Sequence, residues 1–416
     1  MRLRHVMTTR SGLSRWAAAT SAYLPGATRK RIPAFKEAVL LKQHLAISNA
    51  TGKLSNATGK LRSLRGHGAG HSSHRSVRLA RAAMAGAVVI AGLAVAPQAH
   101  ADGGVGINSL YAFQASDTGL VVNDNGNTTP TGLGMMPGTH PSVSALGSGA
   151  FVAAIEANTS VLWIAGADGT GPIGLPMWPG TSPSITIMRN GMWAIAFQGS
   201  DGNLKVTNQG NPSNPVTYGP MNHQSSPTIT EEPLGNVEVA YESASNELML
   251  AGDVQEPTGL FMRPGTSPSI MTPGFVPAGH NGYEVAYQSP SGTMAITGTL
   301  ITEDTGQPMN TASSPAITTD PANGNGYEVA YESSGNTLAT WGTIDGGGDT
   351  GFPMAPGTGP SITGARSNGE IVAFHSSDGT LHIYDSRETG DFGPQDDPTF
   401  QGMNGGSNPS STSWGS

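Results

Sequence analysis

The amino-acid sequence predicts an all-β protein, a seven-bladed β-propeller closed by pairing of its N- and C-terminal strands. Three observations indicate this fold. A motif built around Ser-Pro-Ser-Ile recurs seven times, with its prolines 41 to 49 residues apart. Each repeat holds three or four short strands separated by turns, which leaves no room for a helix of useful length. The two ends of the repeat region carry complementary parts of one repeat.

The first motif consists of a methionine, a short turn and a strand that follows a proline. Its clearest form, 177–185, reads Met-Trp-Pro-Gly-Thr-Ser-Pro-Ser-Ile, and close forms stand at 262–270 and 354–362. Pro-Gly favours a turn, and the short run after the second proline is typical of a strand. The prolines that anchor the seven copies are Pro141, Pro183, Pro227, Pro268, Pro315, Pro360 and Pro409.

A second motif follows the first at a nearly constant distance. It reads Gly-Tyr-Glu-Val-Ala-Tyr-Gln at 282–288, with a close copy at 326–332. A turn such as Asp201-Gly202 or Asp378-Gly379 and another short strand come next. Asp-Gly between alternating apolar runs is a strong hairpin signal. A unit of about 45 residues therefore supplies one small antiparallel sheet.

The ends of the repeat region decide between a closed ring and an open solenoid. Residues 110–117 carry the second motif without a preceding Ser-Pro-Ser strand, and residues 407–410 carry the first motif with nothing after it. Together they complete a seventh repeat beside six intact ones. A closed ring removes exposed sheet edges, whereas a solenoid needs capping repeats, and the sequence contains none.

Two segments precede the propeller, which we place at 102–416. Residues 1–74 are basic and lack an amphipathic pattern, which predicts a disordered leader. Residues 75–101 contain three arginines, an apolar run and Ala99-His100-Ala101, which predicts a signal peptide and a secreted or cell-surface protein. The apolar run is too short to span a bilayer, so no membrane span is predicted in the mature protein. Either translation begins near Val77 or the leader is unusually long.

The charge of the mature segment excludes one class of partner. From Asp102 onward the sequence has five basic residues and 28 acidic ones, a net charge of about −23. A field of this sign repels phosphate backbones and anionic lipid. We therefore expect no nucleic-acid binding.

Few features of the sequence indicate an enzyme. The sequence has no cysteine, which excludes thiol nucleophiles, thiolate metal sites and disulfides. It contains neither a His-Glu-x-x-His zinc motif nor a Gly-x-Ser-x-Gly nucleophile motif, and the four arginines from Asp102 onward are scattered. We predict no cofactor, no metal and no catalytic residue. The 28 acids still offer pairs of carboxylates, so a glycan-cleaving enzyme stays a distant alternative.

The repeat resembles those of secreted bacterial propeller proteins that are similar to the tectonin-like and fucose-binding propeller lectins. The resemblance covers 102–416 and implies sugar pockets between neighbouring blades, each with an aromatic ring under the sugar and polar groups around it. Related repeats often carry Trp after the Leu of the third strand, and here only Trp163 keeps it. The residues that replace it elsewhere are Lys205, Met249, Ala295, Ala339 and His382. Few inherited pockets are therefore expected.

Four aromatic residues are candidate sugar platforms, because the apolar face of a pyranose packs on a ring. Trp178 is the leading candidate, since it lies in a Pro-Gly turn where a core role is least expected. Trp341 and Tyr384 occupy equivalent places near a strand end. Trp163 falls within a strand, where packing in the core is the favoured interpretation.

The residue that ends the second motif is polar in all seven repeats. One interpretation, which we favour, is a structural hydrogen bond between blades; the other is a hydroxyl-binding group repeated in each pocket. These residues are Gln114, Glu156, Gln198, Glu242, Gln288, Glu332 and His375.

The sequence thus predicts a secreted, non-enzymatic, carbohydrate-binding propeller with several weak sites between blades. Its expected partners are glycans or glycoconjugates, with fucose-type sugars among them. A protein-interaction scaffold without a sugar site is the main alternative, and the identity of the sugar stays open.

Overall fold

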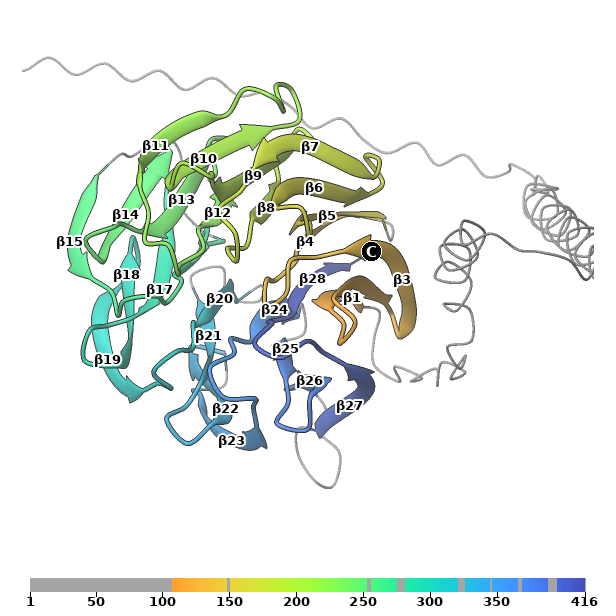
Figure 1. Cartoon of the computed structure of the whole chain (residues 1–416). Helices are drawn as coiled ribbons and strands as arrows, with labels where there is room; N and C mark the ends of the chain where they lie inside the picture. The colour runs from red at the N-terminus through yellow and green to blue at the C-terminus, as the bar shows by residue number, and fades with distance from the viewer. Residues whose placement is uncertain are drawn as a thin grey trace, which may run out of the picture. The chain divides into compact units, whose positions relative to one another are not determined.

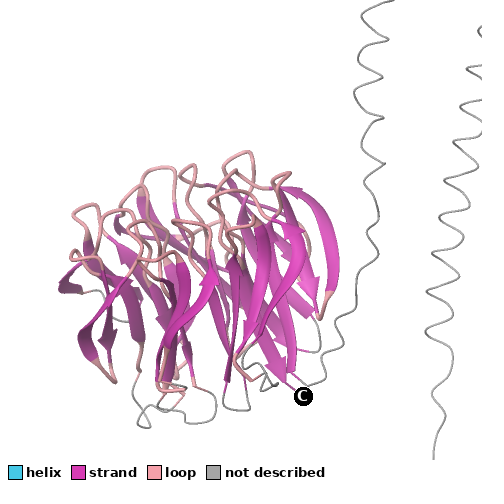
Figure 2. Cartoon of the chain, turned by 90° about the horizontal axis from the view of Figure 1, so that it is seen from below, coloured by secondary structure: helices cyan, strands magenta, loops and turns pink. Residues whose placement is uncertain are grey.

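A computed structural model describes residues 107–147, 150–252, 256–274, 281–320, 326–344, 346–365, 369–387 and 395–415. Within these ranges, 28 strands form seven four-stranded antiparallel sheets and no helix is present. The sheets stand as blades around one axis (Figures 1 and 2). The predicted seven-bladed propeller is therefore confirmed. The predicted leader at 1–74 and signal peptide at 75–101 lie outside the described residues.

We number the blades I to VII in chain order and give the strands of each from the axis outward. They are: I, β28 (Ser410–Gly415), β1 (Ile107–Gln114), β2 (Gly119–Asp124), β3 (Asn127–Gly134); II, β4 (Ser142–Gly147), β5 (Ala150–Glu156), β6 (Val161–Gly166), β7 (Gly171–Pro176); III, β8 (Ser184–Ile187), β9 (Trp193–Gln198), β10 (Asn203–Asn208), β11 (Val216–Pro220); IV, β12 (Thr228–Glu231), β13 (Val237–Glu242), β14 (Glu247–Gly252), β15 (Pro257–Phe261); V, β16 (Ser269–Met271), β17 (Glu284–Gln288), β18 (Thr293–Gly298), β19 (Thr302–Pro308); VI, β20 (Ala316–Thr319), β21 (Tyr327–Glu332), β22 (Thr337–Gly342), β23 (Gly348–Pro353); VII, β24 (Ser361–Ala365), β25 (Gly369–His375), β26 (Thr380–Asp385), β27 (Gln395–Gly402).

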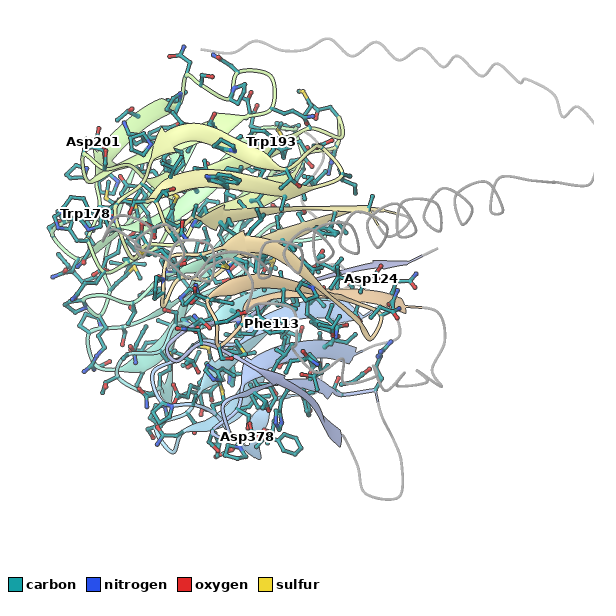
Figure 3. All side chains as sticks on the ribbon, turned by 45° about the vertical axis from the view of Figure 1, so that its right-hand side comes forward. Phe113, Asp124, Trp178, Trp193, Asp201 and Asp378 are labelled. Carbon is teal, nitrogen blue, oxygen red and sulfur yellow. The ribbon has the colours of Figure 1, made fainter. Side chains whose placement is uncertain are left out.

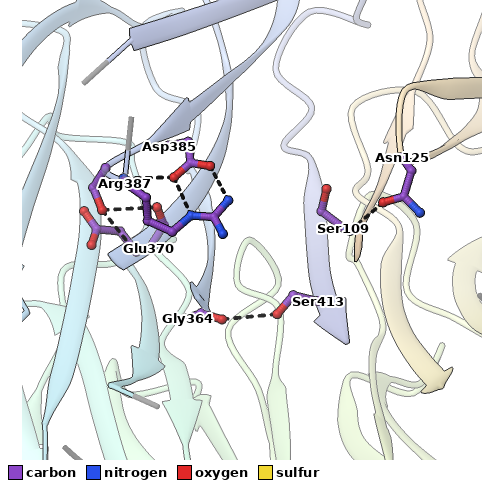
Figure 4. Close-up of polar contacts among 8 residues, drawn as sticks. Ser109, Asn125, Gly364, Glu370, Asp385, Arg387 and Ser413 are labelled. Carbon is purple, nitrogen blue, oxygen red and sulfur yellow. Dashed lines mark hydrogen bonds and ion pairs between the residues drawn. The ribbon is translucent and has the colours of Figure 1, made fainter. Parts of the chain in front are cut away.

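Blade I closes the ring with strands from both ends of the described chain. The C-terminal β28 pairs antiparallel with β1, in a register that runs from Ile107 opposite Gly415 to Ala112 opposite Ser410. Strand β28 also lies beside β24 of blade VII and β4 of blade II (Figure 1). Ser413 Oγ donates a hydrogen bond to the carbonyl oxygen of Gly364 in blade VII, at 3.2 Å (Figure 4). The split repeat expected from the sequence is thus present as a complete sheet.

A serine follows five of the seven anchoring prolines, and its hydroxyl ties one blade to the next; Thr228 and Ala316 take its place after Pro227 and Pro315. Ser142 Oγ accepts a hydrogen bond from the backbone N–H of Ile185 at 3.0 Å. Ser410 accepts from Val143 at 3.0 Å in the same way, across the point where the ring closes. This bond satisfies a backbone donor of the inner strand that has no partner within its own sheet. The serine of the repeat therefore serves assembly of the ring.

A second set of bonds uses the residue before the proline. The backbone N–H groups of Ser182, Ser226 and Ser267 each donate to the serine hydroxyl of the following blade, all at 2.9 Å. His140 continues this series of hydrogen bonds between blades I and II, where the ring closes, because its Nδ1 accepts from the N–H of Asn408 at 2.8 Å. An acceptor nitrogen cannot carry a proton, and burial lowers the pKa of His140 to about 4, which favours this neutral form.

The apolar core consists of seven clusters, one in each gap between neighbouring blades. Every gap is filled by the methionine of the first motif, which is at most 5% exposed in all seven copies. A flexible thioether side chain adapts to gaps of slightly different shape. These methionines are Met135, Met177, Met221, Met262, Met309, Met354 and Met403.

Candidate functional site

One position of the repeat differs between the gaps that are packed with apolar side chains and the two in which a cavity is found. It lies two residues before the motif methionine, near the end of the outer strand. Its occupants in blades I to VII are Leu133, Leu175, Gly219, Leu260, Gln307, Phe352 and Gln401. The three leucines and the phenylalanine pack against the apolar clusters of their gaps. We call this position the gap residue.

A cavity of about 460 Å³ lies between blades V and VI, where the gap residue is Gln307. Blade V contributes the end of β19, and blade VI contributes strands β21, β22 and β23 with the turns between them. A volume of this size is in the range of small-ligand pockets. The lining residues are Gln307, Pro308, Tyr331, Ser333, Ser334, Gly335, Ala339, Thr340, Trp341, Gly346, Gly347, Gly348 and Asp349.

The aromatic part of this cavity comes from Trp341 on β22. Its ring is half-buried and packs against the cluster between blades V and VI. The ring of Tyr327 supports it, with 5.8 Å between the ring centroids and 37° between the planes. The small side chain of Ala339, two residues earlier on the same face of the strand, leaves the space that the cavity occupies. Trp341 therefore presents a supported aromatic surface to a ligand.

Polar groups stand around this surface. Tyr331 is 4% exposed, and burial together with the charge of Asp349 raises the pKa of its hydroxyl to about 12. The phenol thus stays protonated at ordinary pH and can donate a hydrogen bond. Asp349 is exposed, and its Oδ1 accepts from the N–H of Gly351 at 2.9 Å. With the hydroxyls of Ser333 and Ser334, the lining offers both donors and acceptors.

A cavity of about 480 Å³ occupies the equivalent place between blades III and IV. Here the gap residue is Gly219, and a Cβ atom at this position would lie 3.3 Å from the hydroxyl oxygen of Tyr241. Tyr241 corresponds to Tyr331 in the repeat, and Met249 replaces Ala339. The lining residues are Gly219, Pro220, Tyr241, Ser243, Ala244, Ser245, Glu247, Met249 and Pro257.

The structure separates the four aromatic candidates. Trp341 lines the V/VI cavity. Tyr384, its equivalent in blade VII, is only 4% exposed, and its ring packs near that of Phe352, with centroids 5.9 Å apart. The expectation of a sugar platform at Tyr384 therefore needs correction, because the gap residue Phe352 covers it. Trp163 is half-buried and packs with Leu133 against the I/II cluster, in agreement with the core interpretation.

Trp178 lies outside both cavities, in the turn between β7 and β8. Its indole is half-buried and stacks on the imidazole of His223, with 3.9 Å between centroids and 24° between planes. Trp178 and Asp201 lie on the same side of the ring, opposite Asp124 (Figure 3). Asp201 forms an ion pair with Lys205 at 2.9 Å. Trp178 thus belongs to a separate aromatic pair that joins the turn between blades II and III to the turn between blades III and IV.

The seven polar residues that end the second motif are buried, with exposures of 0% to 3%. They bond to the motif turn of the next repeat. Gly138 N–H donates to Gln114 Oε1 and Gly357 N–H donates to a carboxylate oxygen of Glu332, both at 2.9 Å. None of the seven lines either cavity. This geometry favours the structural interpretation for Gln114, Glu156, Gln198, Glu242, Gln288, Glu332 and His375.

Sequence reasoning did not single out Tyr331, Tyr241, Asp349 or the gap residue Gln307. A signal for the last was present, because this position is Leu or Phe in four repeats and polar or Gly in the others. Whether a polar residue or glycine at this position leaves a cavity depends on which side chain faces it from the neighbouring blade.

The described residues contain no helix long and apolar enough to cross a membrane. Nor do they hold a group of three or more His, Asp or Glu side chains placed to bind a metal ion.

No family model and no curated protein matches the chain. Among solved structures it is similar to AofleA from Arthrobotrys oligospora, with 11% identity, a TM-score of 0.45, and 76% of this chain and 95% of that chain covered. It is also similar to the fungal lectin of Aleuria aurantia, a six-bladed β-propeller with a fucose recognition mode. The identity is 12%, the TM-score is 0.44, and 64% of this chain and 95% of that chain are covered. A third similar structure is the BP39L lectin from Burkholderia pseudomallei, with 14% identity, a TM-score of 0.47, and 71% of this chain and 97% of that chain covered. Likenesses this distant carry no argument about function.

Proposed function

We propose that this protein is a carbohydrate-binding propeller without enzymatic activity, and that its sugar sites are the two cavities between blades III and IV and between blades V and VI. The observation that carries the proposal is the V/VI cavity, where the Trp341 ring stands beside the Tyr331 hydroxyl and the Ser333 and Ser334 side chains. A sugar ring needs this combination, because its C–H face is apolar and its edge carries hydroxyls.

The two sites differ in strength under this proposal. The III/IV cavity has Tyr241 and serines but no tryptophan in its lining. It therefore binds more weakly than the V/VI cavity. Two sites on one rigid ring can engage a multivalent glycan surface together, and the resulting avidity exceeds either affinity. The signal peptide predicted at 75–101 would deliver the protein to such a surface outside the cell.

A glycan array with the purified full chain, fucosides included, tests the proposal. We expect binding to at least one class of glycan, and Trp341→Ala should weaken it by roughly tenfold or more, in line with the loss of an aromatic platform. Direct titration of the best array ligand measures the change.

Trp178→Ala is the matched control, because it removes a tryptophan that lies outside both cavities. If this variant loses binding while Trp341→Ala keeps it, the site lies at the Trp178–His223 pair and the cavity assignment is wrong. If no glycan binds the intact protein, the lectin proposal fails and the scaffold alternative gains support.

A further inference from the structure

The two cavities share an electrostatic feature that the proposed function does not use. Each contains one carboxylate and no basic residue: Asp349 lines the V/VI cavity and Glu247 lines the III/IV cavity. Within the described residues, Asp349 Oδ2 has neither a hydrogen-bond nor an ion-pair partner, while Oδ1 accepts from Gly351. The carboxylate is therefore available to a ligand on one side.

The basic residues of the described chain are engaged elsewhere. Arg189 pairs with Glu231, Lys205 with Asp201 and Arg387 with Asp385 (Figure 4). The fourth, Arg263, approaches Gly292 in blade V, outside both linings. Among the described residues, no basic group in either lining can thus neutralise an anionic ligand, and the surplus of acidic residues repels one at longer range.

In the V/VI cavity, aromatic rings add to the attraction of a positively charged ligand. The Trp341 ring is half-buried beside the nearly buried Tyr331 ring, its face carries partial negative charge, and a cation over such a face is attracted to it. Asp349 stands beside these rings, and its charge already acts on the Tyr331 hydroxyl. Aromatic faces next to a carboxylate are a typical environment for an ammonium group.

We propose that the V/VI cavity prefers sugars that carry a free, protonated amino group, and that it discriminates against uronic and sialic acids. The preference rests on the proposed sugar binding and deepens it. The III/IV cavity shares the sign of charge through Glu247, whose Oε1 already accepts from the N–H of Gly259 at 3.1 Å. It lacks the tryptophan face and discriminates less.

Titration of the full chain with three oligosaccharide probes tests this preference: β-1,4-linked glucosamine, its N-acetylated counterpart and a galacturonate oligomer. At about pH 6 and low salt, we expect the glucosamine oligomer to bind roughly two- to fivefold more tightly than the N-acetylated one. The galacturonate oligomer should not bind measurably. Added salt should reduce the difference, because exposed charges are screened.

Variants assign the effect to the cavity. Asp349→Asn should abolish the preference for the free amine, so that the glucosamine oligomer and its N-acetylated counterpart bind with equal affinity. Asp168→Asn removes the same charge from an exposed turn of blade II and should change neither affinity. Trp341→Ala should weaken both ligands together.

Equal affinities for the amine and its N-acetylated form would overturn the charge preference, as would binding of the galacturonate oligomer or an unchanged preference in Asp349→Asn. Each of these outcomes leaves sugar binding intact. Absence of binding to all three probes and to the glycan array would instead overturn the proposed function itself.

Discussion

Trp341 and Tyr384 occupy the same position of the repeat, yet only Trp341 reaches a cavity. The difference comes from the residue that faces them across the gap: Gln307 beside Trp341, and Phe352 beside Tyr384. A leucine or phenylalanine at this place gains free energy by burying its side chain in the gap, whereas a glutamine or glycine leaves room. Single side chains on one blade thus decide whether the aromatic residue of the next blade is available.

Closing the V/VI cavity tests this interpretation. Gln307→Leu should reproduce the filled gaps of the other blades, and we expect sugar binding to fall by at least tenfold. The free energy of unfolding should stay the same or rise by about 1 kcal/mol, because the new side chain is buried. Titration and chemical unfolding measure the two effects.

Gln401→Leu makes the same chemical change at the equivalent position of blade VII and should leave binding in place. A Gln307→Leu variant that binds as well as the parent protein would show that the cavity is not the site.

The buried glutamates produce a second effect at this scale. Burial raises the pKa of Glu332 from 4.5 to about 7. The folded protein therefore binds this proton more tightly than the unfolded chain, and the stability that the group contributes is lost as the pH rises from about 4.5 through 7. Glu332→Gln removes the titration and keeps an acceptor, as Gln114 does naturally for Gly138.

We expect Glu332→Gln to match the parent protein below about pH 4.5 and to be about 1 to 3 kcal/mol more stable above pH 7. Denaturant unfolding across this pH range measures the difference. Glu303→Gln, an exposed charge removal on β19, should show no such pH profile. A constant difference between Glu332→Gln and the parent protein would contradict the burial argument.

At the scale of strands, the innermost element of each blade depends on its neighbour more than on its own length. Strand β16 has three residues and β8 has four, too short to hold a register alone. The serine hydroxyls of the inner strands supply additional bonds, as between Ser142 and Ile185. Proline and serine therefore recur in the repeat for the assembly of the ring, independently of any ligand.

Ser142→Ala leaves the N–H of Ile185 without this acceptor. We expect a loss of about 1 to 2 kcal/mol in the free energy of unfolding, the usual effect of leaving a buried donor unpaired. Ser213→Ala, an exposed hydroxyl removal, is the control and should have no measurable effect. The reciprocal change Ala316→Ser places a hydroxyl where the repeat lacks one, and should raise stability by about 0.5 to 1 kcal/mol. A neutral Ser142→Ala would show that the inter-blade bonds add little.

At the scale of the whole molecule, the ring depends on one pairing between distant parts of the chain. Strand β28 covers the edge of β1 and touches the inner strands of blades II and VII. Without it, blade I has three strands, and buried residues such as Leu110 lie at an open edge. Closure therefore couples the two ends of the described chain to every other blade.

Deletion of 407–416 should abolish cooperative thermal unfolding and produce aggregated protein, observed by calorimetry and size-exclusion chromatography. Deletion of 1–74, the segment predicted to be a disordered leader, should leave the thermal midpoint unchanged. A C-terminal deletion that unfolds like the parent protein would show that the ring does not depend on this strand.

The architecture was predictable because the same pattern of turns and strands occurs in every repeat, so each copy supports the assignment made for the others. Seven copies of one motif define the turns, the strand lengths and the split seventh blade, and alternation of apolar residues defines the buried faces. The leading site was less predictable. Trp341 was among the candidates, but Tyr384 in the same register is buried, and Trp178 stacks on His223 away from both cavities.

The sequence by itself determined that this protein is a closed ring of seven β-blades with an acidic surplus and no cysteine. Only the tertiary structure placed a cavity in the III/IV gap and another in the V/VI gap. The physical reason is that each gap is shaped by side chains from two blades that are distant in the sequence, such as Gln307 and Trp341, and that its free space depends on their combined volume. In the sequence, the two side chains of a gap stand at separate positions of two repeats. Only the folded ring brings them face to face.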